Sequence, residues 1–221
     1  MKKPLKTLLT LAATVLIGSV VHVEVAKADP IGPTCGTCQG SIYTLSYSGS
    51  PLPDADPAHQ TFRITLTIDT NGYTGGGVAL DSAAIKVSSS VVSSSLVAAP
   101  GGVADWSLVP GGINAGGCSG SGGGFDCANW VAVGPGAAVG AGKVLVFTFD
   151  QTMNNGSLLT SISAASIKAR YVNAAGNKVG ALVSENITLQ RSTVPEPASL
   201  LLLGSGLAGI GVWEMKRRKN A

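Results

Sequence analysis

The stretch Thr61-Phe62-Arg63-Ile64-Thr65-Leu66-Thr67-Ile68 decides the fold class of this chain. Its even-numbered residues are all apolar, and its odd-numbered residues are all polar. Successive side chains of a β-strand point to opposite faces, so this alternation indicates a strand with one face in the core and the other in solvent. A half-buried strand of this kind is typical of an antiparallel sheet.

Four other stretches carry strand-like patterns between turn signals. They are residues 41–48, 143–150, 165–172 and 178–190. Residues 143–150 are apolar on nearly both faces and predict a central strand, while residues 165–172 and 178–190 predict an adjacent pair. Asn-Gly dipeptides at 71–72 and 155–156 mark turns. Together these signals predict an all-β fold, an antiparallel β-sandwich of the Ig-like or jelly-roll-like kind.

Residues 111–142 form a glycine-rich segment, in which twelve of 32 residues are glycine. Glycine raises the entropy cost of ordering the chain and has no side chain to bury. We therefore expect long loops here, around one short strand near residues 129–133. Long loops on a rigid scaffold often carry binding sites, so this segment is the candidate binding region. The alternative is a solvated insertion without a function.

The N-terminus has the three parts of a secretory signal peptide. Three lysines precede the apolar stretch 8–21, and Ala26 and Ala28 occupy the two positions that signal peptidase recognises. We expect passage through the Sec translocon and cleavage after Ala28, which would remove a signal helix at residues 1–28. A retained membrane anchor is the alternative.

The C-terminus carries Pro195, Glu196 and Pro197, followed by the apolar residues 198–213 and the basic cluster 216–219. The apolar run of 16 residues is just short of the usual transmembrane helix. Basic residues favour the cytoplasmic side, which predicts a transmembrane helix with the preceding domain outside the cytoplasm. The two prolines keep Glu196 in extended backbone that a protease or transpeptidase can reach.

This order of features over residues 194–219 resembles the PEP-CTERM sorting tail of Gram-negative bacteria, with Pro195, Glu196 and Pro197 as the sorting motif. The resemblance implies exosortase, a membrane protein, as a partner. It implies an intermediate anchored in the inner membrane, then a place on the cell surface or in the extracellular matrix. It also implies a link to exopolysaccharide and biofilm, and some ice-binding proteins end in the same tail. An ordinary permanent anchor, or a helix-packing face of small residues at 204–209, is the alternative.

Residues 29–193, between the two ends, are long enough for one exported domain with its own core. Seven basic and nine acidic residues are spread along this segment, so the net charge of +3 of the whole chain comes from its ends. A nucleic-acid surface needs clustered Lys and Arg, and the segment has no such cluster. We therefore expect no nucleic-acid partner.

The four cysteines, Cys35, Cys38, Cys118 and Cys127, all lie in the exported segment. An even number in an oxidising compartment indicates disulfides, and three pairings are open. We expect the local pairs Cys35–Cys38 and Cys118–Cys127, because each pair flanks a glycine-containing loop. A redox C-x-x-C site and a four-cysteine zinc site are the alternatives, but no βαβ pattern surrounds the motif.

The exported segment offers little catalytic machinery. It contains one histidine, His59, in a stretch whose prolines predict a loop, and one glutamate, Glu185. A catalytic triad needs a histidine held by packing, and glycoside hydrolysis needs two carboxylates flanking the scissile bond. We expect no enzyme, no catalytic residue, no metal-binding residue and no cofactor beyond a weak, unassigned calcium site.

Carboxylates and aromatic rings give two weaker candidates for binding. Oxygen ligands for calcium could come from Asp54, Asp56, Asp69, Asp81 and Asp126, although none has the spacing of an EF-hand loop. Trp106 and Trp130 could stack on sugar rings. Tryptophans in a β-domain are more often part of the core, and we expect that role here.

The sequence leaves two functions open. The first is a structural or adhesive surface protein, sorted into an exopolysaccharide-rich envelope. The second is a carbohydrate-binding or ice-binding module that uses the glycine-rich loops or an exposed threonine face. A flat array of threonines is not visible in the sequence beyond Thr65 and Thr67.

Overall fold

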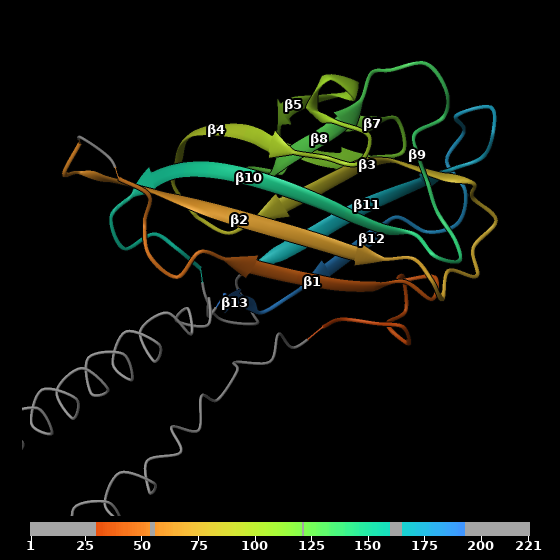
Figure 1. Cartoon of the computed structure of the whole chain (residues 1–221), viewed down its shortest axis with the longest axis horizontal. Helices are drawn as coiled ribbons and strands as arrows, with labels where there is room; N and C mark the ends of the chain where they lie inside the picture. Colours follow the sequence, from red (N-terminus) through yellow and green to blue (C-terminus); the bar gives the residue numbers. More distant parts are fainter. Residues whose placement is uncertain (1–29, 54–55, 121, 160–164, 193–221) are drawn as a thin grey trace, which may run out of the picture.

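The computed structural model describes residues 30–53, 56–120, 122–159 and 165–192, which form two packed β-sheets (Figure 1). The expected signal helix 1–28, with Ala26 and Ala28, lies outside the described residues. So does the expected tail 194–219, with its span 198–213 and with Pro195, Glu196 and Pro197. Within the described ranges, no helix is long and apolar enough to cross a membrane.

The first sheet has five strands and contains the stretch that decided the fold class. Its order is β13 (Leu189–Arg191), β1 (Ile42–Tyr47), β2 (His59–Asp69), β10 (Val144–Asn154) and β4 (Val91–Ala98). Residues 61–68 form the middle of β2, and their apolar members are all buried. The alternation in the sequence therefore predicted both the strand and its buried face.

Strand β10 lies between β2 and β4, as expected of a central strand, but only one of its faces is in the core. Val144 and Val146 on the other face are 51% and 41% exposed. The prediction of a central strand is confirmed, although the apolar sequence does not show which face meets the second sheet.

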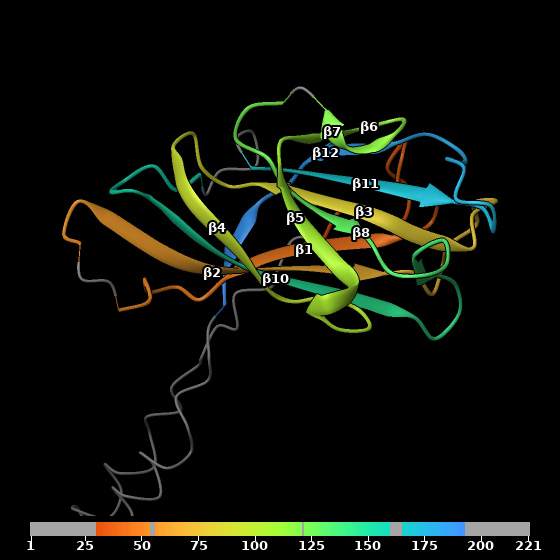
Figure 2. The same ribbon diagram turned by 90° about the horizontal axis from the view of Figure 1, so that it is seen from above.

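The second sheet has the strand order β12 (Val183–Asn186), β11 (Ser166–Val172), β3 (Ala79–Lys86), β8 (Asp126–Trp130) and β5 (Trp106–Pro110). The short β9 (Ala137–Ala138) also pairs with β3, and the 3-10 helix η2 (Val103–Asp105) precedes β5. Figure 2 shows the two sheets edge-on, with β11, β3 and β8 above β1, β2 and β10. The arrangement is a sandwich of two layers.

The last part of the described chain visits both sheets. Strand β11 pairs with β12, so the expected adjacent pair exists. The predicted strand at 178–190 is nevertheless divided, because β13 leaves the second sheet and pairs with β1 in the first. Two stacked sheets are only about 10 Å apart, so a few residues suffice for this crossing. The β1–β13 pairing is parallel, whereas all other strand pairs among the described residues are antiparallel.

The core between the sheets is mostly apolar, and it contains a small tyrosine cluster. The hydroxyl groups of Tyr43 and Tyr171 are 2.6 Å apart, and that of Tyr171 donates to Ser41 Oγ at 2.8 Å. Burial raises the pKa of Tyr171 to about 12, and it also raises the pKa of Tyr43. Both phenols are therefore neutral donors that stabilise the core only while they stay protonated.

The glycine-rich segment 111–142 contains more regular structure than expected. It holds β8, which starts at Asp126 rather than near 129 and lies inside the second sheet between β3 and β5. It also holds β9 and the hairpin formed by β6 (Gly112–Asn114) and β7 (Gly117–Gly120). Small residues such as Ala128 fill the core positions here, so no apolar alternation marks the strands in the sequence.

The β6–β7 hairpin covers the outer face of the second sheet (Figure 2). Under it lies a second, smaller core of Ala84, Ile113 and Cys127, with Phe125 and Leu182 packed at its border. The segment therefore packs against the second sheet, and the prediction of long loops around one short strand was wrong.

Candidate binding groove

An open groove of about 630 Å³ lies where the two sheets end side by side. It is lined by residues 89–94, 108, 110–111 and 122–126. Strands β4 and β5, whose residues form two of its walls, are the edge strands of their sheets. The third wall is a glycine-rich turn at 122–124, so serine hydroxyl groups and peptide groups share the surface with apolar side chains.

Asp126 lies at the floor of this groove and is only 6% exposed. Ser94 Oγ donates a hydrogen bond to Asp126 Oδ2 at 2.5 Å, and Gln151 Nε2 donates to the same oxygen. Gln151 is completely buried, and its Oε1 has no hydrogen-bond partner. Gln151 is not among the residues that line the groove, so this oxygen is not part of the groove surface.

Strand register explains why these three residues meet. Ser94 on β4 is the cross-strand partner of Gln151 on β10, and both point between the sheets. Asp126 is the partner of the core residue Ile85, so it points inward from the other sheet. One carboxylate is thus held from the opposite layer by two neutral side chains.

The charge of the groove is unbalanced. Among the described residues that line it, Asp126 is the only charged one. No ion pair joins Asp126 to a basic side chain in the described part of the chain. Lys168 is nearby, with Nζ 4.7 Å from the centre of the Phe125 ring, but it lies on the outer face of the second sheet. The groove floor is therefore a carboxylate with only neutral partners.

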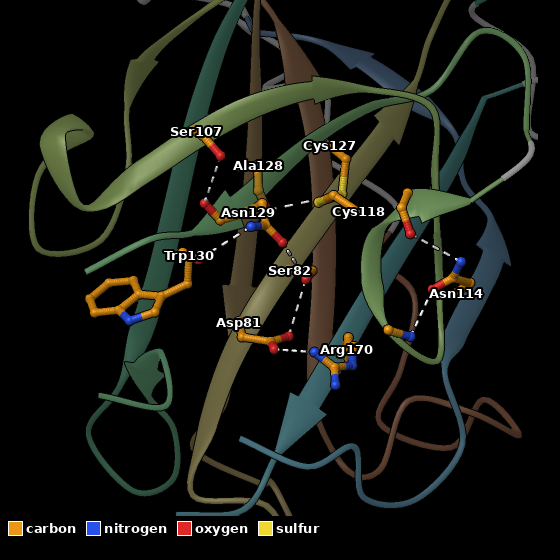
Figure 3. Close-up of a disulfide and its surroundings, with 12 residues drawn as sticks. Asp81, Ser82, Ser107, Asn114, Cys118, Cys127, Ala128, Asn129, Trp130 and Arg170 are labelled. Atoms are coloured by element: carbon orange, nitrogen blue, oxygen red, sulfur yellow. Dashed lines mark hydrogen bonds and ion pairs between the residues drawn. A yellow bond between two sulfur atoms is a disulfide. The ribbon is translucent and has the colours of Figure 1, made fainter. Parts of the chain in front are cut away.

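Figure 3 shows the disulfide Cys118–Cys127, which fixes the chain at the residue that follows Asp126 in the sequence. It joins β7 to β8 with a Cα–Cα distance of 5.7 Å. The second disulfide, Cys35–Cys38, closes a tight turn with a Cα–Cα distance of 5.3 Å. Both pairs are the local pairs that the sequence predicted, so all four cysteines are bonded.

A polar cluster lies under the hairpin on the same outer face (Figure 3). Arg170 pairs with Asp81, and Ser82 donates to the carboxylate of Asp81 at 3.1 Å. Burial raises the pKa of Asp81, although the guanidinium of Arg170 lowers it. Gly117 approaches the cluster at φ 110°, and a Cβ there would be 3.2 Å from Asn129 Oδ1. Only glycine fits this close approach without strain.

His59 and Glu185 lie apart from the groove. His59 is the first residue of β2, which corrects its expected place in a loop, and its Nδ1 is 2.7 Å from Asp56 Oδ2. The backbone N–H of Ala58 and the His59 ring lower the pKa of Asp56. Glu185 accepts a hydrogen bond from Thr37 Oγ1 at 2.5 Å. The structure thus gives each residue a local polar partner far from Asp126 in the fold.

The five candidate calcium ligands do not gather at one place. Asp54 lies outside the described residues, and Asp56, Asp69, Asp81 and Asp126 occupy different elements. The described ranges contain no group of three or more His, Cys, Asp or Glu side chains that could hold a metal ion.

The two tryptophans belong mainly to the core. Trp106 is buried, with its ring centre 4.8 Å from that of Phe147 and 5.2 Å from that of Trp130. Trp130 is half-buried and donates its Nε1–H to the carbonyl of Gly134 at 3.1 Å. The core role predicted for them is confirmed for Trp106, and Trp130 packs against the same core.

A threonine face was missed by the sequence reasoning. The outer face of the first sheet holds the cross-strand pairs Thr44–Thr67, Thr65–Thr148 and Thr61–Thr152. The ion pair of Arg63 and Asp150, at 2.8 Å, lies among them. The expectation of no array beyond Thr65 and Thr67 was wrong, because the threonines come from three strands that are distant in the sequence.

These features define an exported-type domain: a disulfide-bonded β-sandwich with a neutral-walled groove over a buried carboxylate. The family model of the PEP-CTERM protein-sorting motif matches residues 193–218, which confirms the resemblance of the tail. The motif implies an exported protein that exosortase processes at the membrane. No curated protein and no solved structure matches the chain.

Proposed function

We propose that the exported domain is a non-catalytic surface or matrix protein that attaches to exopolysaccharide through the groove between β4 and β5. The observation that carries this proposal is the preorganised Asp126 at the floor of an open groove lined by serine hydroxyl groups and apolar side chains. Sugar hydroxyl groups are recognised by convergent polar groups of this kind. The disulfide beside Asp126 keeps the acceptor in place before the ligand arrives.

The position of the groove suits a protein that is sorted from a membrane. Strands β13 and β4 are the two edges of the first sheet, and β13 ends directly before the tail. Four strand spacings separate these edges, which is about 19 Å. The groove therefore faces away from the strand that leads to the tail, where an extracellular polymer can reach it.

The same residues argue against turnover. Ser94 donates to Asp126 and has no histidine beside it in the groove lining, so it is not activated as a nucleophile. Glycoside hydrolysis uses two carboxyl groups, and the described groove has one. We also propose that the sandwich belongs with Ig-like or jelly-roll-like architectures.

For the complete chain we propose cleavage after Ala28, then a membrane-anchored intermediate in a Gram-negative bacterium. Exosortase then cuts at the motif of Pro195, Glu196 and Pro197 and places the domain on the surface or in the matrix. Mass spectrometry of envelope material should find Asp29 at the N-terminus and no residues 216–219. An intact C-terminus on surface material would leave a plain anchor instead.

Cosedimentation with extracted exopolysaccharide tests the binding function. Gly123 lines the groove, and a Cβ there meets nothing within 4 Å, so Gly123→Tyr should fill the groove without unfolding the domain. Gly76 is equally open but remote, so Gly76→Tyr is the matched control. We expect the first variant to lose most binding and the control to keep it. Equal binding by both would refute the groove as the site.

The threonine face favours a second candidate, the binding of a flat hydroxyl-rich surface such as ice. Its threonines come from three adjacent strands of the first sheet. Inhibition of ice recrystallisation that is lost in Thr67→Lys and kept in Gly123→Tyr would support this candidate. The exposed Arg63–Asp150 pair interrupts the array, which is why we place it second.

A further inference from the structure

We infer that the groove selects polysaccharides that carry free amino groups, with the ammonium of an amino sugar bound by Asp126. This inference rests on the proposed attachment to exopolysaccharide and names the class of sugar. It starts from the charge of the groove floor, which is a buried carboxylate with two neutral partners, Ser94 and Gln151.

A buried carboxylate without a cation is costly in a folded protein. Removing a charge from water costs several kcal/mol unless a counter-charge or several hydrogen bonds replace the water. Asp126 has two side-chain donors, and both reach the same oxygen, Oδ2. Its Oδ1 receives no hydrogen bond from the described residues and is not fully buried, and Asp126 lines the groove. The carboxylate thus keeps one accessible oxygen for a ligand.

The serine hydroxyl groups of the groove strengthen the case for a donor-rich ligand. Ser89, Ser90, Ser93 and Ser94 line the groove together with Asp126. An ammonium group has three donors and no acceptor, so one donor can reach Asp126 while the others reach hydroxyl oxygens. A sugar hydroxyl also donates, but it brings no charge to Asp126.

The nearby lysines do not supply the missing charge. Lys86 and Lys168 flank the turn at 122–125, but both lie on the outer face of the second sheet, as Cys127 does. Asp126 points to the inner face of that sheet. The sheet therefore separates the lysines from the groove floor.

A calcium ion is a poorer match for the same floor. Calcium takes six to eight oxygen ligands, and extracellular sites usually offer several carboxylates. Asp126 is the one carboxylate among the described residues that line the groove, and the other side-chain oxygens there are serine hydroxyl groups. One monovalent cation balances one carboxylate, so the ammonium is the better counterpart.

Calorimetric titration of the mature protein with two β-1,4-linked hexasaccharides tests the inference. The glucosamine hexamer carries ammonium groups at pH 6, and the N-acetylglucosamine hexamer of equal length carries none. We expect the amino hexamer to bind about tenfold more tightly, the usual gain from one charge-assisted hydrogen bond. The preference should weaken as the salt concentration rises, because screening acts on the charge.

Three variants make the result specific. Asp126→Asn keeps the shape and removes the charge, so the two hexamers should bind equally well. Asp69→Asn makes the same change of net charge at the far end of β2 and should keep the preference. If Asp126→Asn fails to fold, Gly123→Tyr takes its place and should lose the binding of both hexamers.

The outcomes separate the inference from the proposed function. If both hexamers bind wild type equally, and Gly123→Tyr abolishes both, the groove binds glycans but the inference is wrong. If millimolar calcium raises the melting temperature of wild type and not of Asp126→Asn, Asp126 is a metal ligand and the inference is also wrong. If neither hexamer nor extracted exopolysaccharide binds, the proposed function itself fails.

Discussion

Strand β2 and the glycine-rich segment 111–142 build neighbouring parts of one sandwich by different physical means. In β2, every second residue is a large apolar side chain buried between the sheets. In the segment, β8 and its hairpin are held by a disulfide, by small residues and by a polar cluster. The first region has the larger share of hydrophobic stabilisation, and the second positions the groove. This difference predicts where substitutions will cost stability and where they will cost binding.

The largest effect on stability should come from the β2 core. Leu66 is completely buried, and Leu66→Ala should lower the free energy of unfolding by about 3 kcal/mol through lost burial and a residual cavity. Urea unfolding followed by circular dichroism measures this. A loss below about 1 kcal/mol would show that the site collapses around the smaller side chain, and that β2 is not the main source of stability.

The disulfide of the glycine-rich segment should come next. Replacing Cys118 and Cys127 by serine should cost about 2–3 kcal/mol, because the short loop is no longer constrained in the unfolded chain. The disulfide Cys35–Cys38 closes a shorter loop, so replacing Cys35 and Cys38 by serine should cost less. Chemical unfolding of both double variants compares their free energies of unfolding. A larger loss of stability at Cys35 and Cys38 would contradict this prediction.

High pH should destabilise the core through its tyrosine cluster and not through the glycine-rich segment. The pKa of Tyr171 is raised to about 12, so the folded state holds its proton more tightly than the unfolded chain does. Its contribution is complete below about pH 10 and is lost as the pH rises towards 12, by about 2–3 kcal/mol in all. Stability measured from pH 8 to 12 should therefore fall above pH 10. The free energy of unfolding should fall less steeply with pH in Tyr171→Phe. An unchanged slope would show that Tyr171 does not cause the loss of stability.

The smallest stability effect should come from a single glycine. At φ 110°, Gly117→Ala should cost about 1–2 kcal/mol, because an alanine strains this backbone and crowds Asn129. Gly116, its neighbour without a positive φ, is the control, and Gly116→Ala should change stability by less than about 0.5 kcal/mol. Thermal unfolding compares the two, and equal effects would mean that the close approach under the hairpin is not restrictive.

The same contrast explains what the sequence could predict. Alternation predicted β1 and β2, because each large apolar side chain on the buried face leaves a visible signal. It failed for β8, whose buried positions hold Ala128 and Asp126, and it could not show that β13 joins the other sheet. The disulfide pairs were predictable from their local spacing. The meeting of Asp126, Ser94 and Gln151 was not, because cross-strand register between distant segments brings them together.

The central claim is that the groove beside the glycine-rich segment, and not the outer face of β2, is the binding surface. NMR titration of the isotope-labelled mature protein with fragments of extracted exopolysaccharide tests it most directly. We predict that the amide signals of residues 89–94 and 122–126 shift on binding, while those of Thr44, Thr65 and Thr67 stay in place. Shifts concentrated on those threonines, with the groove signals unchanged, would contradict the account.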